Sequence, residues 1–142
     1  MKESRLLKER ATCNTTYWLD LPDQSIAFGL NKVNPEVDAF LAAQGQERWA
    51  FLTAYNPRAH TASAQQNQYH QRLLIRDVAN MGLEFLGGSD VSYDGGFPPE
   101  RCIFILGISV EKALQLAARH RQAAIVMGER GQPARLIYAE KK

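Results

Sequence analysis

Five polar residues in the middle of the chain are of the types that bind or transform ligands: Asn56, Arg58, Asn67, Asp94 and Glu100. An asparagine both donates and accepts hydrogen bonds, and an arginine offers a planar fork to a carboxylate or phosphate. Carboxylates act as acids or bases, or hold cations. We therefore predict these five as the ligand-binding set and assign no catalytic residue.

Asn56 and Arg58 flank a proline directly after the apolar run Arg48–Ala54. Such a run is typical of a strand that is covered on both faces. In open α/β sheets, ligands bind beyond the carboxyl ends of the strands. We therefore predict that this loop lines a small-anion pocket in which Arg58 selects the anion. The alternative is that Asn56 satisfies its own turn and Arg58 is solvated.

Asn67 lies on a helix predicted from about residue 63 to residue 81. It is in register with the apolar residues Leu74 and Val78, which places it on the core side of that helix. Burying an amide without a hydrogen bond costs about 1–3 kcal/mol. We therefore predict that Asn67 is buried and bonded to the loop of Asn56 or to the glycine-rich loop around residue 95, with a ligand as the alternative partner.

Asp94 and Glu100 bound the glycine- and proline-rich end of the run Tyr93–Glu100, just before the apolar segment Cys102–Leu106. Two acids beside a cleft could do acid–base work or hold a cation. Their separation fits no metal-ligand spacing, and neither do the three histidines. An Asp-Gly turn and an ion pair are the competing interpretations. We predict no metal and no cofactor.

The elements that would position these residues alternate between strands and helices in the order ββαβαββαββ. Strands are predicted at 16–21, 25–30, 48–54, 83–86, 102–106, 123–127 and 134–138, and helices at 34–45, at 63–81 and after Ser109. We predict a single domain over residues 1–142, with an N-terminal extension or short helix at 1–15 and a core at 16–142. The fold class is α/β with a central mixed sheet and about three helices, or α+β if most strand pairs are antiparallel.

The composition is that of an ordinary globular protein, with 45% hydrophobic and 23% charged residues and a net charge of +2. That charge is too small to indicate nucleic acid, but residues 48–76 contain no acid and carry a local positive potential. No run approaches the roughly 20 apolar residues that span a bilayer. Two cysteines without framework spacing favour a reducing compartment. We expect a cytoplasmic protein that does not enter membranes.

Several segments together resemble a bacterial family known as domain of unknown function 3293. The matching pieces, in the family's order and spacing, are Phe51–Pro57, Asn67, Asp94–Glu100, Ile105–Ser109 and Gln122–Val126. The resemblance runs from about residue 49 to residue 138. It implies a compact, mostly bacterial, cytoplasmic domain without a known reaction, substrate or cofactor.

One corner departs from the family pattern. The family usually has Phe-Gly-Gln-Asn-Ala before its penultimate strand, where this chain has His120-Arg121-Gln122-Ala123-Ala124. The glycine of a turn and the asparagine are therefore replaced, by Arg121 and Ala123.

Three functions remain open. The first is a binding or regulatory module for a small anionic ligand or a protein partner, with its pocket between the Asn56 loop, the start of the second helix and the Gly95 loop. The second is a small hydrolase or transferase acting on a nucleotide-like substrate, with Glu100 or Asp94 as base and Arg58 as charge stabiliser. The third is a weak nucleic-acid contact through residues 48–76. We place the binding module first and leave open whether the protein is an enzyme.

Overall fold

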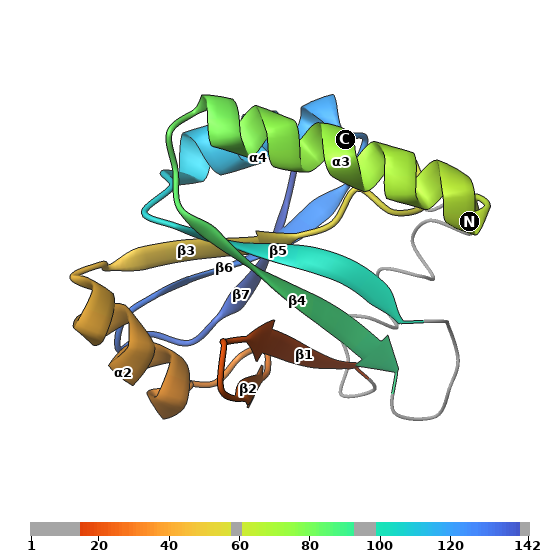
Figure 1. Ribbon diagram of the computed structural model, residues 1–142. Helices are drawn as coiled ribbons and strands as arrows, with labels where there is room; N and C mark the ends of the chain where they lie inside the picture. Colours follow the sequence, from red (N-terminus) through yellow and green to blue (C-terminus); the bar gives the residue numbers. More distant parts are fainter. Residues whose placement is uncertain (1–14, 58–60, 93–98, 140–142) are drawn as a thin grey trace.

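The computed structural model describes residues 15–57, 61–92 and 99–139. These residues form seven strands and three helices in the predicted order (Figure 1). Their bounds are β1 (Thr15–Asp20), β2 (Ser25–Phe28), α2 (Pro35–Gln44), β3 (Arg48–Leu52), α3 (Ala64–Asn80), β4 (Phe85–Ser92), β5 (Glu100–Leu106), α4 (Val110–Arg119), β6 (Ala124–Glu129) and β7 (Arg135–Tyr138). The extension predicted at residues 1–15 lies almost wholly outside the described residues.

The strands form one sheet in the order β2-β1-β4-β5-β3-β6-β7, and each neighbouring pair is antiparallel. The fold is thus the α+β form of the prediction, and the expectation of a mixed sheet is wrong. The two helical crossovers explain the difference. Each crossover, β3–α3–β4 and β5–α4–β6, passes over one strand, and that strand pairs antiparallel with both ends of the crossover. The rule that places ligands at the ends of parallel strands therefore does not apply here.

The sheet curls until its two edges approach each other. After β2, the Asn31 N–H donates to the Ala134 carbonyl at 2.7 Å, and the Ala134 N–H donates to the Lys32 carbonyl at 3.2 Å, just before β7. The ring of Phe28 on edge strand β2 lies 5.3 Å from that of Trp49 on β3. A flat sheet would keep these strands far apart, so the contact shows that the sheet is curled.

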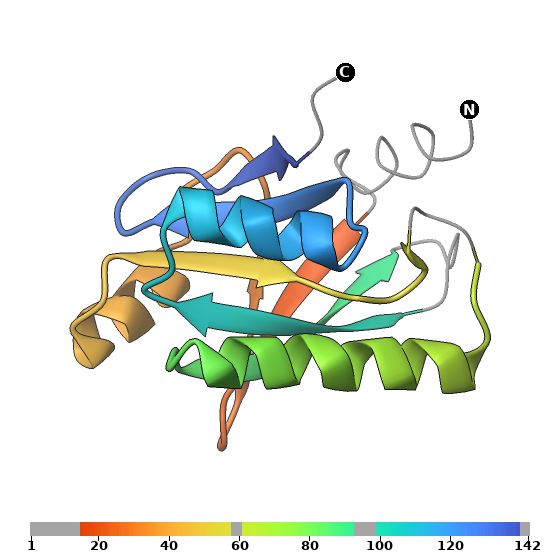
Figure 2. The ribbon, with the colours of Figure 1, turned by 90° about the horizontal axis from the view of Figure 1, so that it is seen from above.

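The curl creates two apolar layers. The concave face holds an aromatic cluster covered by α2, whereas α3 and α4 lie side by side on the opposite face (Figures 1 and 2). On that opposite face, Leu74 and Val78 of α3 pack with Leu116 of α4 and Ile105 of β5. These two helices form the walls of a pocket described below.

Local sequence signals account for the helix starts. Ser63 caps α3 in a capping box with Gln66, and the Ser109 hydroxyl caps α4 by accepting from the Lys112 N–H at 3.2 Å. Asn34 is the N-cap residue of α2, but its side chain makes no cap bond to that helix. Its amide instead pairs with both backbone groups of Gly29 at 3.0 Å, closing the loop between β2 and α2.

Strand β4 is longer than the predicted 83–86 segment, because it continues through Gly87 and Gly88. A Cβ atom on Gly88 would lie 2.3 Å from the Trp18 carbonyl oxygen and 2.7 Å from the Phe51 ring. The glycine thus allows close approach of neighbouring groups and does not end the strand.

Candidate functional site

Three of the five predicted site residues meet at the end of β3. Asn67 is 7% exposed, and its Oδ1 accepts the Asn56 backbone N–H at 2.7 Å while its Nδ2 donates to Asn56 Oδ1 at 3.1 Å. Asn56 in turn accepts the Ala62 N–H at 2.9 Å and donates through Nδ2 to Glu100 Oε2 at 2.9 Å. The prediction for Asn67 is confirmed, and these bonds join the β3 loop to α3 and β5.

A second layer of side chains satisfies the backbone as β3 ends. Gln71 Oε1 accepts the Ala54 N–H at 2.9 Å, and the Thr53 hydroxyl donates to the Arg101 carbonyl at 2.6 Å. Both side chains are buried. Gln71 lies on the core-facing stripe of α3, so the periodicity that located Asn67 indicates it too. Together these bonds hold the Asn56 loop in a fixed place.

Asp90 and Glu100 are two buried carboxylates at directly opposite positions on β4 and β5. Asp90 was not singled out from the sequence, because it lies beyond a glycine pair where no strand was expected. The nearby cavity measures only about 40 Å³. That space suits a water molecule, whose share of liquid volume is roughly 30 Å³, but not a substrate. The acids therefore belong to the interior of the curled sheet.

The other two predicted residues, Arg58 and Asp94, lie outside the described residues. Within the described ranges, the acid-free stretch that motivated a nucleic-acid contact spans two elements. Arg48 begins β3 opposite Glu129 of β6, whereas Arg76 lies on α3. Among residues 15–57, 61–92 and 99–139, no group of three histidines, cysteines or acids could hold a metal ion, and no helix is long and apolar enough to cross a membrane.

A larger pocket lies beside the Asn56 loop, between α3 and the end of α4. We call it the α3–α4 pocket, and its volume is about 310 Å³. Its lining consists of Ala54, Pro57, Tyr69, His70, Leu73, Arg119, His120 and Arg121. Among the described residues, the lining contains two arginines, two histidines and no acid. A pocket of this size and charge fits a small anion-bearing ligand.

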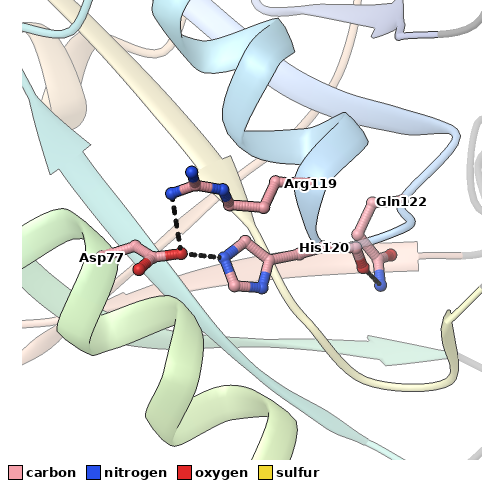
Figure 3. Close-up of polar contacts among 4 residues, drawn as sticks. All are labelled: Asp77, Arg119, His120 and Gln122. Carbon is pink, nitrogen blue, oxygen red and sulfur yellow. Dashed lines mark hydrogen bonds and ion pairs between the residues drawn. The ribbon is translucent and has the colours of Figure 1, made fainter.

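The wall formed by α4 is fixed to α3 through one carboxylate. His120 Nε2 and Asp77 Oδ2 are 2.7 Å apart, and Arg119 Nη1 lies 3.5 Å from the same oxygen. Figure 3 shows both side chains reaching toward Asp77, while Gln122 points the other way. Gln122 Nε2 donates to the Tyr55 carbonyl at 3.0 Å, which ties the end of α4 to the Asn56 loop.

Arg121 adopts a left-handed backbone conformation, with φ of 60°. Its N–H donates to the Ala118 carbonyl at 3.1 Å, and the following N–H, of Gln122, donates to the Ala117 carbonyl at 2.9 Å. These two bonds form a Schellman turn, whose left-handed position is usually glycine. The turn is therefore kept although its glycine is replaced, and the replacement makes an arginine a lining residue of the pocket.

The α3–α4 pocket differs from the pocket predicted between the Asn56 loop, the start of the second helix and the Gly95 loop, and that last loop lies outside the described residues. The lining includes Pro57 next to Asn56 and residues of α3, but also the end of α4, which was not anticipated as a wall. His70, which was considered from the sequence only as a metal ligand, is a lining residue. The one signal available in the sequence was the departure at His120 and Arg121, which was noted without a role.

A second groove, of about 320 Å³, lies along the other side of α3. Arg72 of α3 and Arg101 of β5 line it, over an apolar floor that includes Ile75 and Ile103. Arg101 is also 3.6 Å from Asp20 Oδ2, so part of its charge is already balanced. Arg119 of the α3–α4 pocket is likewise 3.5 Å from Asp77 Oδ2, so each of the two sites contains one arginine whose charge is partly balanced.

Comparisons with known proteins bear on the family alone. Neither the curated proteins nor the solved structures yield a match to this chain. A family described as "Protein of unknown function (DUF3293)" matches residues 52–125, a segment that contains each lining residue of the α3–α4 pocket and the Asn56–Asn67–Glu100 hydrogen bonds. Since that match covers more than half of the sequence, the chain belongs to the DUF3293 family.

Proposed function

We propose that this domain is a binding module for a small anionic ligand and that the α3–α4 pocket is its site. One observation carries the proposal: Arg121 occupies the left-handed position of the α4 turn and lines the pocket. A non-glycine residue in that conformation costs about 1–2 kcal/mol of backbone energy. Strain of this kind is concentrated where a side chain is needed in one place.

Charge supports the same proposal. Arg119 and Arg121 both line the pocket, and a guanidinium donates hydrogen bonds in a fork that matches carboxylate or phosphate. Asp77, the nearby acid, is not among the described lining residues, and its Oδ2 lies 2.7 Å from His120 Nε2 and 3.5 Å from Arg119 Nη1. Asp77 therefore balances part of the charge of Arg119, and Arg121 would supply further positive charge to a ligand.

Binding is favoured over the alternative of catalysis by the placement of Glu100. The hydrolase or transferase hypothesis uses Glu100 or Asp94 as a base. Glu100 is 3% exposed, accepts the Asn56 amide and does not line the pocket. Its contacts suit the positioning of the Asn56 loop better than proton transfer to a ligand.

We also propose that the protein works in the cytoplasm of a bacterial cell, with no cofactor. The family resemblance supports the bacterial origin. The two cysteines, without the spacing of a disulfide framework, support a reducing compartment. Cys102 is buried, and Cys13 lies outside the described residues.

The proposal is tested by NMR titration of the isotopically labelled protein with pyrophosphate. We expect saturable shifts at the backbone amides of Tyr69 and Arg121. Arg121→Gly should weaken binding about tenfold, the lower end of what a charge-assisted hydrogen bond contributes, because Arg121 is exposed. Raising the salt from low to physiological concentration should weaken binding further, since exposed charges are screened within about 8–10 Å.

Arg135→Ala, on the distant strand β7, is the matched control and should leave the pyrophosphate affinity unchanged. Shifts centred on Arg72 and Arg101 would move the site to the other groove. The absence of saturable shifts at any amide would overturn the proposal.

A further inference from the structure

The two walls of the α3–α4 pocket differ in chemistry. The α4 wall presents Arg119 and Arg121, whereas the α3 wall presents Tyr69, His70 and Leu73. Tyr69 is 53% exposed, although it is among the largest hydrophobic side chains of the described residues. An exposed ring beside a cationic wall fits a ligand that has a planar apolar part and an anionic part.

His70 adds a hydrogen-bonding group to the α3 wall. Its ring centroid lies 6.0 Å from that of Tyr69. Its Nδ1 is buried and has no hydrogen-bond partner in the described part of the chain. An unsatisfied buried nitrogen is unfavourable, and a ring rotation toward the pocket would allow it to bond to a ligand. The wall therefore offers both a stacking surface and a polar contact for the edge of a ring.

From this division we infer that the ligand is a nucleoside monophosphate, with its base on Tyr69 and its phosphate on Arg119 and Arg121. This inference rests on the proposed anion-binding function and names the class of ligand for the same pocket. Every base has a π-face that can stack on an aromatic side chain, and stacking contributes about 1–3 kcal/mol per base. His70 would hydrogen-bond to the base edge, and the guanidinium pair would bind the phosphate.

A single nucleotide is favoured over a nucleic-acid strand by the arrangement of the cations. A strand-binding groove carries positive charge along a backbone path of several nucleotides. The pocket gathers its two arginines within three residues at one helix end, while Arg72 and Arg101 lie in the groove on the other side of α3. The described arginines of the pocket thus come from one short segment, and the arginines of the groove belong to a separate site.

The test is isothermal titration calorimetry of the full chain with adenosine 5′-monophosphate, ribose 5-phosphate and adenosine. We expect the monophosphate to bind about 5- to 100-fold more tightly than ribose 5-phosphate, the range that base stacking allows. Adenosine should bind more weakly than the monophosphate, because it lacks the anionic group. Tyr69→Ala should remove the advantage of the monophosphate while the affinity for ribose 5-phosphate stays the same. Tyr138→Ala, another exposed tyrosine on β7, is the control and should change neither affinity.

Each outcome bears on a separate claim. Equal affinities for the monophosphate and ribose 5-phosphate, both weakened by Arg121→Gly, would overturn the nucleotide inference and leave the anion site standing. No binding of any of these phosphates, or of pyrophosphate, would overturn both. Affinity for single-stranded oligonucleotides that rises with length, without binding of the monophosphate, would replace the nucleotide with a nucleic-acid partner. Thermal melting of each variant shows whether it is folded.

Discussion

Helices α2 and α4 end in the same hydrogen-bonded turn, but the left-handed residue is Gly45 in one and Arg121 in the other. In each turn, the N–H of that residue lies 3.1 Å from the carbonyl three residues back, and the next N–H lies 2.9 Å from the carbonyl five residues back. Helix α3 is followed by Gly82, which also has a positive φ. Of the three helix ends in the described part of the chain, only that of α4 lacks the glycine.

Available space does not explain why the α2 turn has glycine at this position. A Cβ atom on Gly45 would meet nothing within 4 Å, so glycine there relieves backbone strain and accommodates no neighbour. Arg121 bears that strain, and its side chain lines a pocket. The comparison shows that a side chain kept in a strained backbone conformation indicates a functional position. The hydrogen bonds of the turn do not, because both helices share them.

The largest expected effect concerns the anchor that α4 has on α3. Asp77→Ala removes the partner of His120 and of Arg119, and we expect the free energy of unfolding to fall by about 2 kcal/mol. Urea denaturation measures this change. Glu84→Ala, at an exposed acid, is the control and should stay within about 0.5 kcal/mol of the parent. In a double-mutant cycle with His120→Ala, a coupling near zero would show that the anchor contributes nothing.

The cost of the backbone strain at positive φ can be tested at the end of α2, by introducing an arginine in place of Gly45. Gly45→Arg should lower the free energy of unfolding by about 1–1.5 kcal/mol, because a Cβ atom crowds the backbone at positive φ. Gln44→Arg, at the last helical residue, is the matched control and should have little effect. If the two variants are equally stable in urea, the strain attributed to Arg121 does not exist.

The reverse change should stabilise the protein. Arg121→Gly relieves the strain but gives the unfolded chain more freedom, so we expect a net gain of about 0.5–1 kcal/mol in the free energy of unfolding. Asn tolerates this conformation, so Arg121→Asn should show a similar gain. A loss of stability in both variants would mean that the guanidinium holds the fold together.

The sequence predicted most of the fold because local signals agreed with packing. The serines that cap α3 and α4 mark their starts, and the register of Leu74 and Val78 placed Asn67 in contact with the Asn56 loop. The direction of strand pairing was harder to predict from the sequence. Whether neighbouring strands run parallel depends on which strand lies between the two ends of each helical crossover, and no local sequence pattern encodes that. The length of β4 was missed because Gly88 serves close packing there, whereas glycine more often ends a strand.

The site was harder to predict than the fold. The Asn56, Asn67 and Glu100 contacts were within reach, because two of these residues lie on recognisable elements beside a proline turn. The α3–α4 pocket was not, since its charged wall depends on how α4 docks against α3. Tyr69 and His70 look like solvated helix positions until that docking is known. The predicted roles of Arg58 and Asp94 remain predictions, as these residues lie outside the described ranges.

The smallest expected effect separates a local site from a diffuse positive surface. Arg76 lies on the same helix as Tyr69 and His70 but does not line the α3–α4 pocket. Arg76→Ala should leave the free energy of unfolding within about 0.5 kcal/mol of the parent, as exposed substitutions usually do.

The affinity of the Arg76→Ala variant for pyrophosphate should also stay nearly constant, whereas Arg58→Ala is predicted to weaken it, because residue 58 follows the lining residue Pro57. Titration of both variants at two salt concentrations checks this. Comparable losses from Arg76→Ala and Arg121→Gly would mean that the positive charge of α3 acts as a whole, and the difference between the ends of α2 and α4 would then have no bearing on binding.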